Sequence, residues 1–490
     1  MKKIAICVGL AAIAASSAYA GNGHMLHGFG PVNSSMGGAG AALWVDDPAA
    51  ALMFNPALMG EGEGTYITFG TEFFEDGFEV EVTLADGTKG FPKNSNQFGV
   101  LPTFAFSTRI ENTPVSWGFG LVGMAGFRTD FREDPAGILF ARSGLGGFGR
   151  LYTDFRVIKI PLALAYEVND RLTIGVALNN YVGELSISPN PGERADVGPN
   201  GELFFAEADG LDQSWAWSIQ PGFLYKINDK LALGGSLTTK QDFDNYSWNS
   251  RNPNPHDPNF GAHRKLSFGL DGPLMITLGL GYEMNERTRF ALDGQWIQYS
   301  GVDGFGSPGG IVGGRIFSFG WNDVYVAKFG FEHDVNDRLS IRAGYNFNTQ
   351  VVPEKNVLTS SGAPSYFRHH FAAGLSYDLT DNLRADLGAY FVPRDGVKGP
   401  LPTTDGFQNG PTIGTVEESN TLTSVQVGLT WTFGGEALPP VGGGGKMPVF
   451  SGKSGRTLSG GSGGGGGMSL EDENAALRKR VAELEAQAKN

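Results

Sequence analysis

The chain has 490 residues, of which 41% are hydrophobic, 12% aromatic and only 18% charged. Glycine is unusually frequent, with 74 residues, and this combination is typical of a glycine- and aromatic-rich β protein. The formal net charge of −14 argues against nucleic acid and other polyanions as partners.

Residues 1–20 have the pattern of a secretory signal peptide. Two lysines precede an apolar run, and small residues then lead to an A-x-A cleavage site that ends at Ala20. Cleavage there would make Gly21 the first residue. The only cysteine, Cys7, lies in the signal peptide, so we expect no disulfide, no thiolate-bound metal and no cofactor. Beyond residue 20, no uninterrupted apolar stretch approaches the roughly 18 residues of a transmembrane helix.

Residues 21–64 differ in character from the rest of the chain. The stretch GPVNSSMGGAGAALWVDDPAAALMFNPALMG, which begins at Gly30, is rich in small and apolar residues and has little of the two-residue alternation of a strand. Such a segment is suited to compact packing inside the lumen of a barrel. The sequence therefore predicts an N-terminal plug.

Residues 65–433 show the alternation of antiparallel strands. Leu339 and Ile341, for example, fall on one face of a strand and Ser340 on the other. The polar faces carry mostly Gly, Ser, Asn and Thr, which favours an all-β transmembrane barrel with lipid outside and a polar lumen. We expect about fourteen strands, near 66–74, 99–110, 114–127, 154–168, 171–184, 213–227, 230–239, 266–284, 287–299, 321–335, 338–349, 367–379, 382–393 and 420–433.

A repeated phrase marks the turns between these strands. It recurs as YEVNDRLTIGVAL from Tyr166, YKINDKLALGGSL from Tyr225, YEMNERTRFALDG from Tyr282, EHDVNDRLSIRAGYNF from Glu332 and YDLTDNLRADLGAY from Tyr377. Each copy places a turn-forming pair such as Asn-Asp between two alternating runs. With IENTPV from residue 110, all tight turns fall on one side of the barrel and the longer loops on the other. This pattern, with an even strand count, is typical of an outer-membrane barrel with periplasmic turns and both termini in the periplasm.

The stretch VDDPAAALMFNPALM, ahead of these strands, resembles the FadL family of outer-membrane transporters for long-chain fatty acids and related hydrophobic compounds. Its Asn55, Pro56 and Ala57 match the Asn-Pro-Ala motif of that family's N-terminal hatch, and the resemblance covers residues 21–433. It implies uptake of a hydrophobic small molecule through a barrel that the hatch plugs. A plain turn is the alternative interpretation of the triplet, because proline fixes φ in any loop.

The resemblance also implies a lateral exit. In the family, ligand passes from an extracellular groove to a lumen pocket against the hatch, and leaves through a gap in the wall where the third strand kinks inward. GMAGFRTDF, from Gly123, lies at the matching place. Gly126 is the candidate for the kink, since glycine inside a strand often marks a bulge or bend. The alternative is that Gly126 is one of many barrel glycines.

A fatty acid needs an apolar pocket with one or two cations for its carboxylate. Alternation directs four candidate carboxylate-binding cations into the lumen: Lys159, Lys328, Arg342 and Arg384. Glu332 and Asp386 face inward beside them, so a lumen ion-pair ladder is the alternative. The apolar ligand-binding candidates lie in the hatch, and packing against the wall is their alternative role: Met36, Leu43, Trp44, Leu52, Met53 and Phe54.

Motifs for catalysis do not form a consistent set. Two matches to G-x-G-x-x-G, from Gly118 and Gly144, have no helix after them. His369 and His370 are adjacent in a strand and point to opposite faces, so they cannot share a metal. We therefore expect a protein that is not an enzyme. Two other classes stay open: a general or aromatic-hydrocarbon-specific porin and, with less support, an outer-membrane enzyme or adhesin.

The chain continues past Phe433, where a barrel of this kind would end. Residues 434–467 are rich in Gly, Ser and Pro, which predicts a flexible linker. Residues 468–490 contain a short heptad pattern made by Leu470, Asn474, Leu477, Val481 and Leu484. We expect a short amphipathic helix that self-associates or binds a periplasmic partner. The alternative is a helix that frays until it finds a partner, because it is so short.

Overall fold

The computed structural model describes residues 21–95, 98–134, 137–140, 149–306, 310–312, 315–402 and 411–434. The chain divides into two units, Met1–Ser454 and Gly455–Asn490, and all of the second unit lies outside the described residues. The predicted signal peptide, the predicted C-terminal helix and the part of the predicted linker after Gly434 lie outside them as well.

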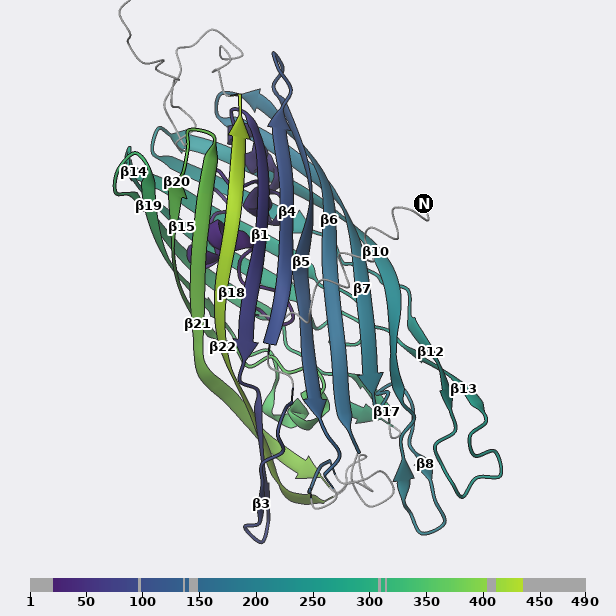
Figure 1. The fold of residues 1–490 in the computed structure, drawn as a ribbon. Coiled ribbons are helices and arrows are strands. Elements are labelled where there is room, and N and C mark those ends of the chain that lie inside the picture. The colour runs from purple at the N-terminus through teal and green to yellow at the C-terminus, as the bar shows by residue number, and fades with distance from the viewer. Residues whose placement is uncertain are drawn as a thin grey trace, which may run out of the picture. The chain divides into compact units, whose positions relative to one another are not determined.

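Fourteen antiparallel strands form a closed barrel (Figure 1), because the last strand, β22, pairs with the first, β1. The strands are β1 (Thr65–Asp76), β4 (Phe98–Arg109), β5 (Val115–Phe131), β6 (Leu151–Asn169), β7 (Leu172–Ser188), β10 (Ala208–Asn228), β11 (Leu231–Thr238), β14 (Leu274–Asn285), β15 (Thr288–Gln298), β18 (Val324–Asp334), β19 (Leu339–Asn348), β20 (His369–Asp378), β21 (Leu383–Pro402) and β22 (Thr412–Phe433). The predicted fold class is confirmed, and each predicted strand overlaps one of these.

Four pairs of short strands lie in the longer connections between the described barrel strands. They are β2 (Glu79–Leu84) with β3 (Lys89–Gly90), β8 (Asp196–Val197) with β9 (Leu203–Phe204), β12 (Tyr246–Arg251) with β13 (His263–Phe268), and β16 (Gly310–Val312) with β17 (Arg315–Ser318). In Figure 1, β3, β8, β13 and β17 lie toward the lower end of the barrel. The strand predicted at 266–284 is therefore two strands, β13 and β14, and the break contains Pro273, which has no N–H to give to a ladder.

The repeated phrase forms the tight turns, as predicted, and its asparagine explains why the phrase recurs. The Oδ1 of Asn169 accepts the backbone N–H groups two and three residues ahead, at 2.9 and 3.0 Å. Asn228 and Asn336 make the same pair of bonds in their own turns. Thr380 plays this part in the last copy through its hydroxyl, which accepts from Asn382 and Leu383. The side chain thus replaces a missing backbone partner and fixes the register of both strands.

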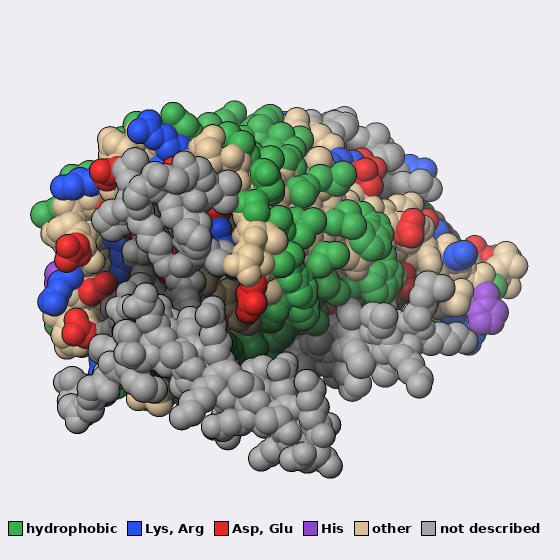
Figure 2. All heavy atoms as spheres, turned by 90° about the horizontal axis from the view of Figure 1, so that it is seen from above, with side chains coloured by type: hydrophobic (Ala, Val, Ile, Leu, Met, Phe, Trp, Pro, Cys, Tyr) green, Lys and Arg blue, Asp and Glu red, His purple; other side chains and the backbone are tan. Residues whose placement is uncertain are grey.

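The outer surface of the wall is apolar. Leu162 and Leu164 on β6 are 55% and 52% exposed, and they lie opposite Leu178 and Val176 on β7, which are also exposed. Figure 2 shows one face of the molecule, on which hydrophobic side chains form a broad patch with charged side chains to either side. Such a band is what lipid contact requires of a barrel.

The N-terminal segment, which we define as residues 21–64, lies in the lumen and contains α2 (Gly30–Ser35), α3 (Pro48–Phe54) and the 3₁₀ helix η1 (Pro56–Glu61). Every residue from 21 to 60 is buried. Helix α2 packs against β19 to β22 and β1, whereas η1 packs against β4 to β7 and β10. Two more 3₁₀ turns, η2 (Glu354–Asn356) and η3 (Leu358–Ser360), lie in the connection from β19 to β20.

Inward-facing glycines of the wall make room for the N-terminal segment. A Cβ on any of these glycines would lie within 3 Å of an atom of that segment: Gly175, Gly222, Gly234, Gly281, Gly330, Gly344, Gly374, Gly388 and Gly428. At Gly344, for instance, it would lie 2.0 Å from the nitrogen of Gly37. The high glycine content therefore serves the close approach of two backbones in the lumen.

Candidate functional site

Asn55, Pro56 and Ala57 form the junction between α3 and η1. Asn55 is fully buried, and its Nδ2 donates to the carbonyl oxygens of Ala41 at 2.7 Å and Phe223 at 2.8 Å. Its Oδ1 accepts the N–H of Ala57 at 3.1 Å and so caps η1. Pro56 takes the first position of η1, where its missing N–H costs nothing. One side chain thus ties the N-terminal segment to itself and to β10.

Further contacts hold the N-terminal segment against the wall. The Oδ2 of Asp293 on β15 accepts the N–H groups of Gly40 and Ala41 at 2.8 and 2.9 Å. The Nη2 of Arg384 on β21 donates to the carbonyl oxygen of Asp46 at 3.0 Å. These bonds attach the segment to strands far apart in the barrel, so the segment bridges the lumen.

Asp47 caps α3, since its Oδ1 accepts the N–H of Ala49 at 2.9 Å. Burial raises the pKa of Asp47 to about 6, and the positive charge of Arg384 opposes that rise. Asp47 therefore caps the helix through one carboxylate oxygen, whereas its Oδ2 has no hydrogen-bond partner among the described residues.

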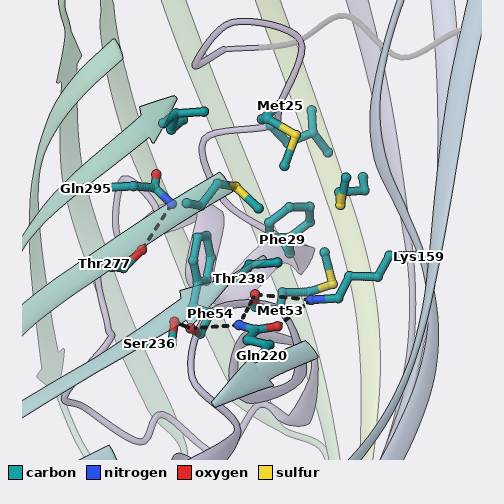
Figure 3. Close-up of a pocket in the computed structure, with 14 residues that line it drawn as sticks. Met25, Phe29, Met53, Phe54, Lys159, Gln220, Ser236, Thr238, Thr277 and Gln295 are labelled. Carbon is teal, nitrogen blue, oxygen red and sulfur yellow. Dashed lines mark hydrogen bonds between the residues drawn. The ribbon is translucent and has the colours of Figure 1, made fainter. Parts of the chain in front are cut away.

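A pocket lies between the N-terminal segment and the wall (Figure 3). It is lined by Met25, Leu26, Phe29, Met53, Phe54, Met124, Lys159, Gln220, Ser236, Thr238, Met275, Thr277, Gln295 and Ile297. It holds about 420 Å³ of space between atoms, part of it open to solvent. Four methionines and two phenylalanines dominate the lining, with a few polar groups among them. That composition is typical of a site for a small hydrophobic ligand, and methionine adapts to varied shapes.

Lys159 on β6 is the one charged side chain among the described residues that line the pocket. Its Nζ donates to the Oε1 of Gln220 at 2.8 Å and to the carbonyl oxygens of Leu52 and Met53 at 3.2 and 3.4 Å. All three acceptors are neutral, and Lys159 is only 2% exposed. Of the four predicted cations, Lys159 is therefore the one that could neutralise a carboxylate in this pocket.

Two of the other predicted cations are engaged in ion pairs. Arg342 lies 2.5 Å from a carboxylate oxygen of Glu332, and Arg384 lies 2.8 Å from one of Asp386. Arg289 joins the same ladder through Glu332 at 2.6 Å. Arg342 and Arg384 therefore belong to an ion-pair ladder in the lumen, which was the alternative interpretation. Neither of these two arginines lines the pocket.

Lys328 lies just outside the pocket. Its ammonium nitrogen is 4.2 Å from the centroid of the Phe54 ring, and it donates to the carbonyl oxygen of His27 at 3.4 Å. A cation over an aromatic face is attracted by the ring quadrupole. Lys328 therefore touches the pocket only through the ring of Phe54.

Of the six apolar candidates, Met53 and Phe54 line the pocket, and the other four pack elsewhere in the lumen. Trp44, for example, packs edge-on against Tyr66 at 5.3 Å between ring centroids. Sequence reasoning missed the remaining apolar lining residues, which are Met25, Leu26, Phe29, Met124, Met275 and Ile297. Alternation gives the face on which a wall residue lies but not its place around the barrel. It therefore does not predict that residues of β14 and β15 line the pocket.

The third strand of the barrel, β5, leaves its neighbour β4 part-way along. The ladder between them runs from Arg109–Ser116 to Thr103–Val122 and stops there, whereas β5 stays paired with β6 up to Phe131. All six residues from 122 to 127 are buried, so the outward alternation of β5 is lost over this stretch. We call the place where β4 and β5 separate, residues 98–102 and 123–131, the seam.

The N-terminal segment supplies the missing partner of β5 at the seam. The N–H of Leu26 donates to the carbonyl oxygen of Met124 at 3.2 Å, and the N–H of Gly126 donates to that of His24 at 3.0 Å. A register irregularity lies between Gly123 and Ala125 on the β6 side. The predicted kink residue, Gly126, follows this irregularity directly. Its φ of 158° is positive and lies in a region that residues with a Cβ rarely adopt, so its backbone conformation favours glycine.

Within the described ranges, no three His, Cys, Asp or Glu side chains are arranged to hold a metal ion. His369 and His370 diverge as predicted: the Nδ1 of His369 hydrogen-bonds to the hydroxyl of Tyr345 at 2.7 Å, whereas His370 is fully buried. No helix in the part of the chain that the structure describes is long and apolar enough to cross a membrane.

Comparison with known proteins identifies the family. The model for the outer membrane protein transport protein family (OMPP1/FadL/TodX) matches residues 11–431. The chain belongs to this family. The expectation of an outer-membrane transport protein is thus confirmed at family level, and the family's description is one of transport and not of catalysis.

Relatives of this family member are distant in sequence. This chain is 24% identical over 374 residues to the 47 kDa outer membrane protein of Pasteurella multocida, and the aligned stretch covers 70% of this chain and 81% of the relative. Among solved structures it resembles the toluene transporter TodX of Pseudomonas putida, with a TM-score of 0.61, 20% identity and coverage of 83% and 99%. A FadL homologue of Pseudomonas aeruginosa gives the same TM-score at 14% identity, with coverage of 84% and 99%. Likeness at these identities establishes a shared fold.

The Asn55→Ala substitution should loosen the plug without unfolding the barrel. It removes three hydrogen bonds of a buried side chain and leaves their partners unsatisfied, which costs about 1–3 kcal/mol for each buried group. We expect faster amide hydrogen exchange in residues 40–60, measured by mass spectrometry, with unchanged exchange in the strands. The control is Asn228→Ala, which removes an exposed turn asparagine. Unchanged exchange in residues 40–60 of Asn55→Ala would contradict the assigned role.

Proposed function

We propose that this protein takes up hydrophobic small molecules across the outer membrane and holds them, in transit, in the pocket between the N-terminal segment and the wall. The observation that carries the proposal is the methionine- and phenylalanine-rich pocket against the plug of a barrel that belongs to a transport family. An apolar lining with few polar groups favours transfer of an apolar ligand from water. A general porin would instead have an open, water-filled lumen.

Long-chain fatty acids are the substrate class that we favour. Lys159 offers a positive charge among neutral acceptors in an otherwise uncharged lining. A carboxylate bound there would gain a charge-assisted hydrogen bond, while the alkyl chain would lie among the methionines. The second candidate is a monoaromatic hydrocarbon. It is supported by Phe29 and Phe54 in the lining. It is also supported by the fold that the chain shares with two toluene transporters, TodX of Pseudomonas putida and TbuX of Ralstonia pickettii, the second at 18% identity and a TM-score of 0.56.

The seam is the exit that we propose. Met25, Leu26 and Met124 belong both to the pocket lining and to the contact that covers the edge of β5. A ligand that displaces residues 24–26 would open a path from the pocket through the seam to the membrane. Two backbone hydrogen bonds hold these residues there, so displacement has a modest cost of about 1 kcal/mol for each bond.

In this proposal, residues 21–64 act as the hatch and both termini lie in the periplasm. The periplasmic position of both termini is supported by the even number of strands, because an even number returns the chain to the side from which it started. The predicted linker 434–467 and helix 468–490 would then reach a periplasmic partner or a neighbouring copy from the end of β22.

The Lys159→Met substitution tests the carboxylate site. It keeps the length and apolar stem of the side chain and removes its charge. We expect binding of a long-chain fatty acid to purified protein to weaken by about ten- to a hundredfold, the value of one charged hydrogen bond, with binding of toluene nearly unchanged. Isothermal titration calorimetry would measure both ligands.

The matched control for that experiment is Lys328→Met, which removes the other buried lysine of the pocket region. We expect Lys328→Met to weaken fatty-acid binding less than Lys159→Met does. Equal loss in both variants, or equal loss for both ligands, would contradict a carboxylate site at Lys159.

The Gly126→Val substitution tests the exit. A β-branched residue favours a regular strand and stiffens the bend, so we expect uptake by cells to fall about tenfold or more, on the general cost of an overcrowded buried site, while ligand binding to the purified protein is retained. Gly294→Val is the control, because a Cβ at Gly294 would meet no atom within 4 Å. Uptake by Gly126→Val cells at the rate of the Gly294→Val control would disprove an exit at this position.

A further inference from the structure

The connection from β19 to β20 is folded into the barrel at the end opposite the tight turns. We call its residues 351–367 the mouth segment, and this segment contains η2 and η3. Only Glu354 and Lys355 in it are exposed, and Pro353 and Leu358 are partly buried, whereas all its other residues are buried. Connections normally run over the surface of a protein. The mouth segment instead fills space inside the lumen.

The mouth segment contacts strands that lie well apart around the wall. The Oη of Tyr366 donates to one carboxylate oxygen of Glu418 on β22 at 2.7 Å, and the hydroxyl of Ser361 donates to the other. A Cβ on Gly362 would lie 3.1 Å from the Oγ1 of Thr153 on β6. Three strands of the wall, β1, β4 and β5, separate β22 from β6. The mouth segment therefore reaches across the lumen.

Two further parts of the chain are tied to the mouth segment. The Nδ2 of Asn356 donates to the carbonyl oxygen of Gly320, in the connection before β18, at 2.8 Å. The Oγ of Ser365 donates to the carbonyl oxygen of Gly23 at 3.0 Å. Gly23 directly precedes residues 24–26, which pair with β5 at the seam. The mouth segment thus contacts the N-terminal segment beside the proposed exit.

A continuous hydrophobic cluster connects the mouth segment with the ligand pocket. Val357, Tyr366 and Phe367 of the mouth segment belong to the same cluster of buried side chains as Met25 and Phe29 of the pocket lining. Clusters defined by side-chain contact are contiguous. A hydrophobic ligand that entered where the mouth segment lies would therefore stay in contact with apolar side chains on its way to the pocket.

The mouth segment has the form of a compact loop that can move as a unit. Its two ends are close together, since the N–H of Asn348 donates to the carbonyl oxygen of Arg368 at 3.0 Å. Its own turns hold its shape, as where the N–H of Ala363 donates to the carbonyl oxygen of Ser360 at 2.8 Å. Compact loops with neighbouring ends are frequently functional. Displacement of the mouth segment would leave the strand ladder intact.

We propose that the mouth segment is a lid, which closes the lumen at the loop end and must swing away from β6 and β22 before a hydrophobic ligand can reach the pocket. The lid then controls entry to the pocket, while residues 24–26 cover the exit. The hydrogen bond between Ser365 and Gly23 joins the two. This inference rests on the proposed uptake function, because it names the entrance to the same pocket.

A disulfide that fixes the lid to β6 tests the proposal. The 3.1 Å between a Cβ on Gly362 and the Oγ1 of Thr153 is about the separation of a Cβ and the partner sulfur in a disulfide. The φ of Gly362 is not positive, and the Oγ1 of Thr153 has no hydrogen-bond partner among the described residues. The only native cysteine, Cys7, lies in the predicted signal peptide. The test protein carries Thr153→Cys and Gly362→Cys together, and each single variant is a matched control.

Two measurements follow passage of the lid. The first is uptake of oleate and of toluene by cells, with and without dithiothreitol, which opens the disulfide. The second is oxidation by peroxide of the four pocket methionines in purified protein, followed by mass spectrometry. Methionine oxidation reports access to the pocket without any transported ligand.

We expect the disulfide to form in the folded protein and to lower uptake of both compounds by about tenfold or more, since passage follows the local opening equilibrium. Dithiothreitol should restore uptake, which also shows that the variant is folded, and the single variants should not respond to it. Oxidation of the pocket methionines should slow by a similar factor in the locked protein relative to the single variants.

Failure of the disulfide to form in folded protein, or uptake by the locked protein at the rate of the single variants, would overturn the lid. If unmodified protein takes up neither oleate nor toluene, the proposed function fails, and methionine oxidation alone decides on the lid. Slower oxidation in the locked protein would then support the lid, and unchanged oxidation would overturn it.

Discussion

The fold depends on one constraint, which is that hydrocarbon offers no partner to a backbone N–H or carbonyl group. Thirteen successive pairings and the return of β22 to β1 satisfy that constraint almost everywhere around the wall. The exception is the seam, where β5 parts from β4 after Val122. There residues 24–26 of the N-terminal segment pair with β5 as a substitute strand. The weakest place in the wall and the start of the plug are therefore one structural unit.

The glycine-rich inner wall follows from the same arrangement. A plug that must lie against many strands needs wall positions without side chains, and glycines such as Gly234 and Gly344 provide them. Farther along β10, β11 and β14 than these close approaches, and on β6 and β15, inward side chains such as Gln220 and Met275 line the pocket between wall and plug. Whether an inward-facing wall position is glycine or a larger residue therefore decides whether the plug packs closely there or a ligand pocket is lined there.

Most of the fold could be predicted from the sequence because its signals are local. Alternation located all fourteen strands, and the Asn-Asp phrase located the turns, since Asn169 and its equivalents cap the turn with their own side chains. The break at Pro273 and the loop strands β12 and β13 were missed, because a long connection can be mistaken for the extension of a neighbouring strand. The linker and C-terminal helix lie outside the described residues and stay predictions.

The site was less predictable, because it depends on which strands face each other across the lumen. Met53, Phe54 and Lys159 were among the candidates and do line the pocket. Met124, Met275 and Ile297 were not, since neither alternation nor composition gives the position of a residue around the barrel. Arg342 and Arg384 face inward beside acids, as alternation predicts, and the structure shows which acid each one contacts: Glu332 lies across the β18–β19 ladder from Arg342, and Asp386 lies two residues along β21 from Arg384. The sequence predicts which face of a strand a side chain lies on, but the structure is needed to show which side chains it contacts.

The central claim is that residues 21–60 close a lumen whose wall stands without them. Single-channel conductance in a planar bilayer tests it most directly, with purified full-length protein compared to a variant that lacks Gly21 to Gly60. The strand ladder involves none of the deleted residues except at the seam, so the variant should remain a folded barrel and should show a large, steady conductance that the full-length protein lacks. A folded variant whose conductance equals that of the full-length protein would contradict the account.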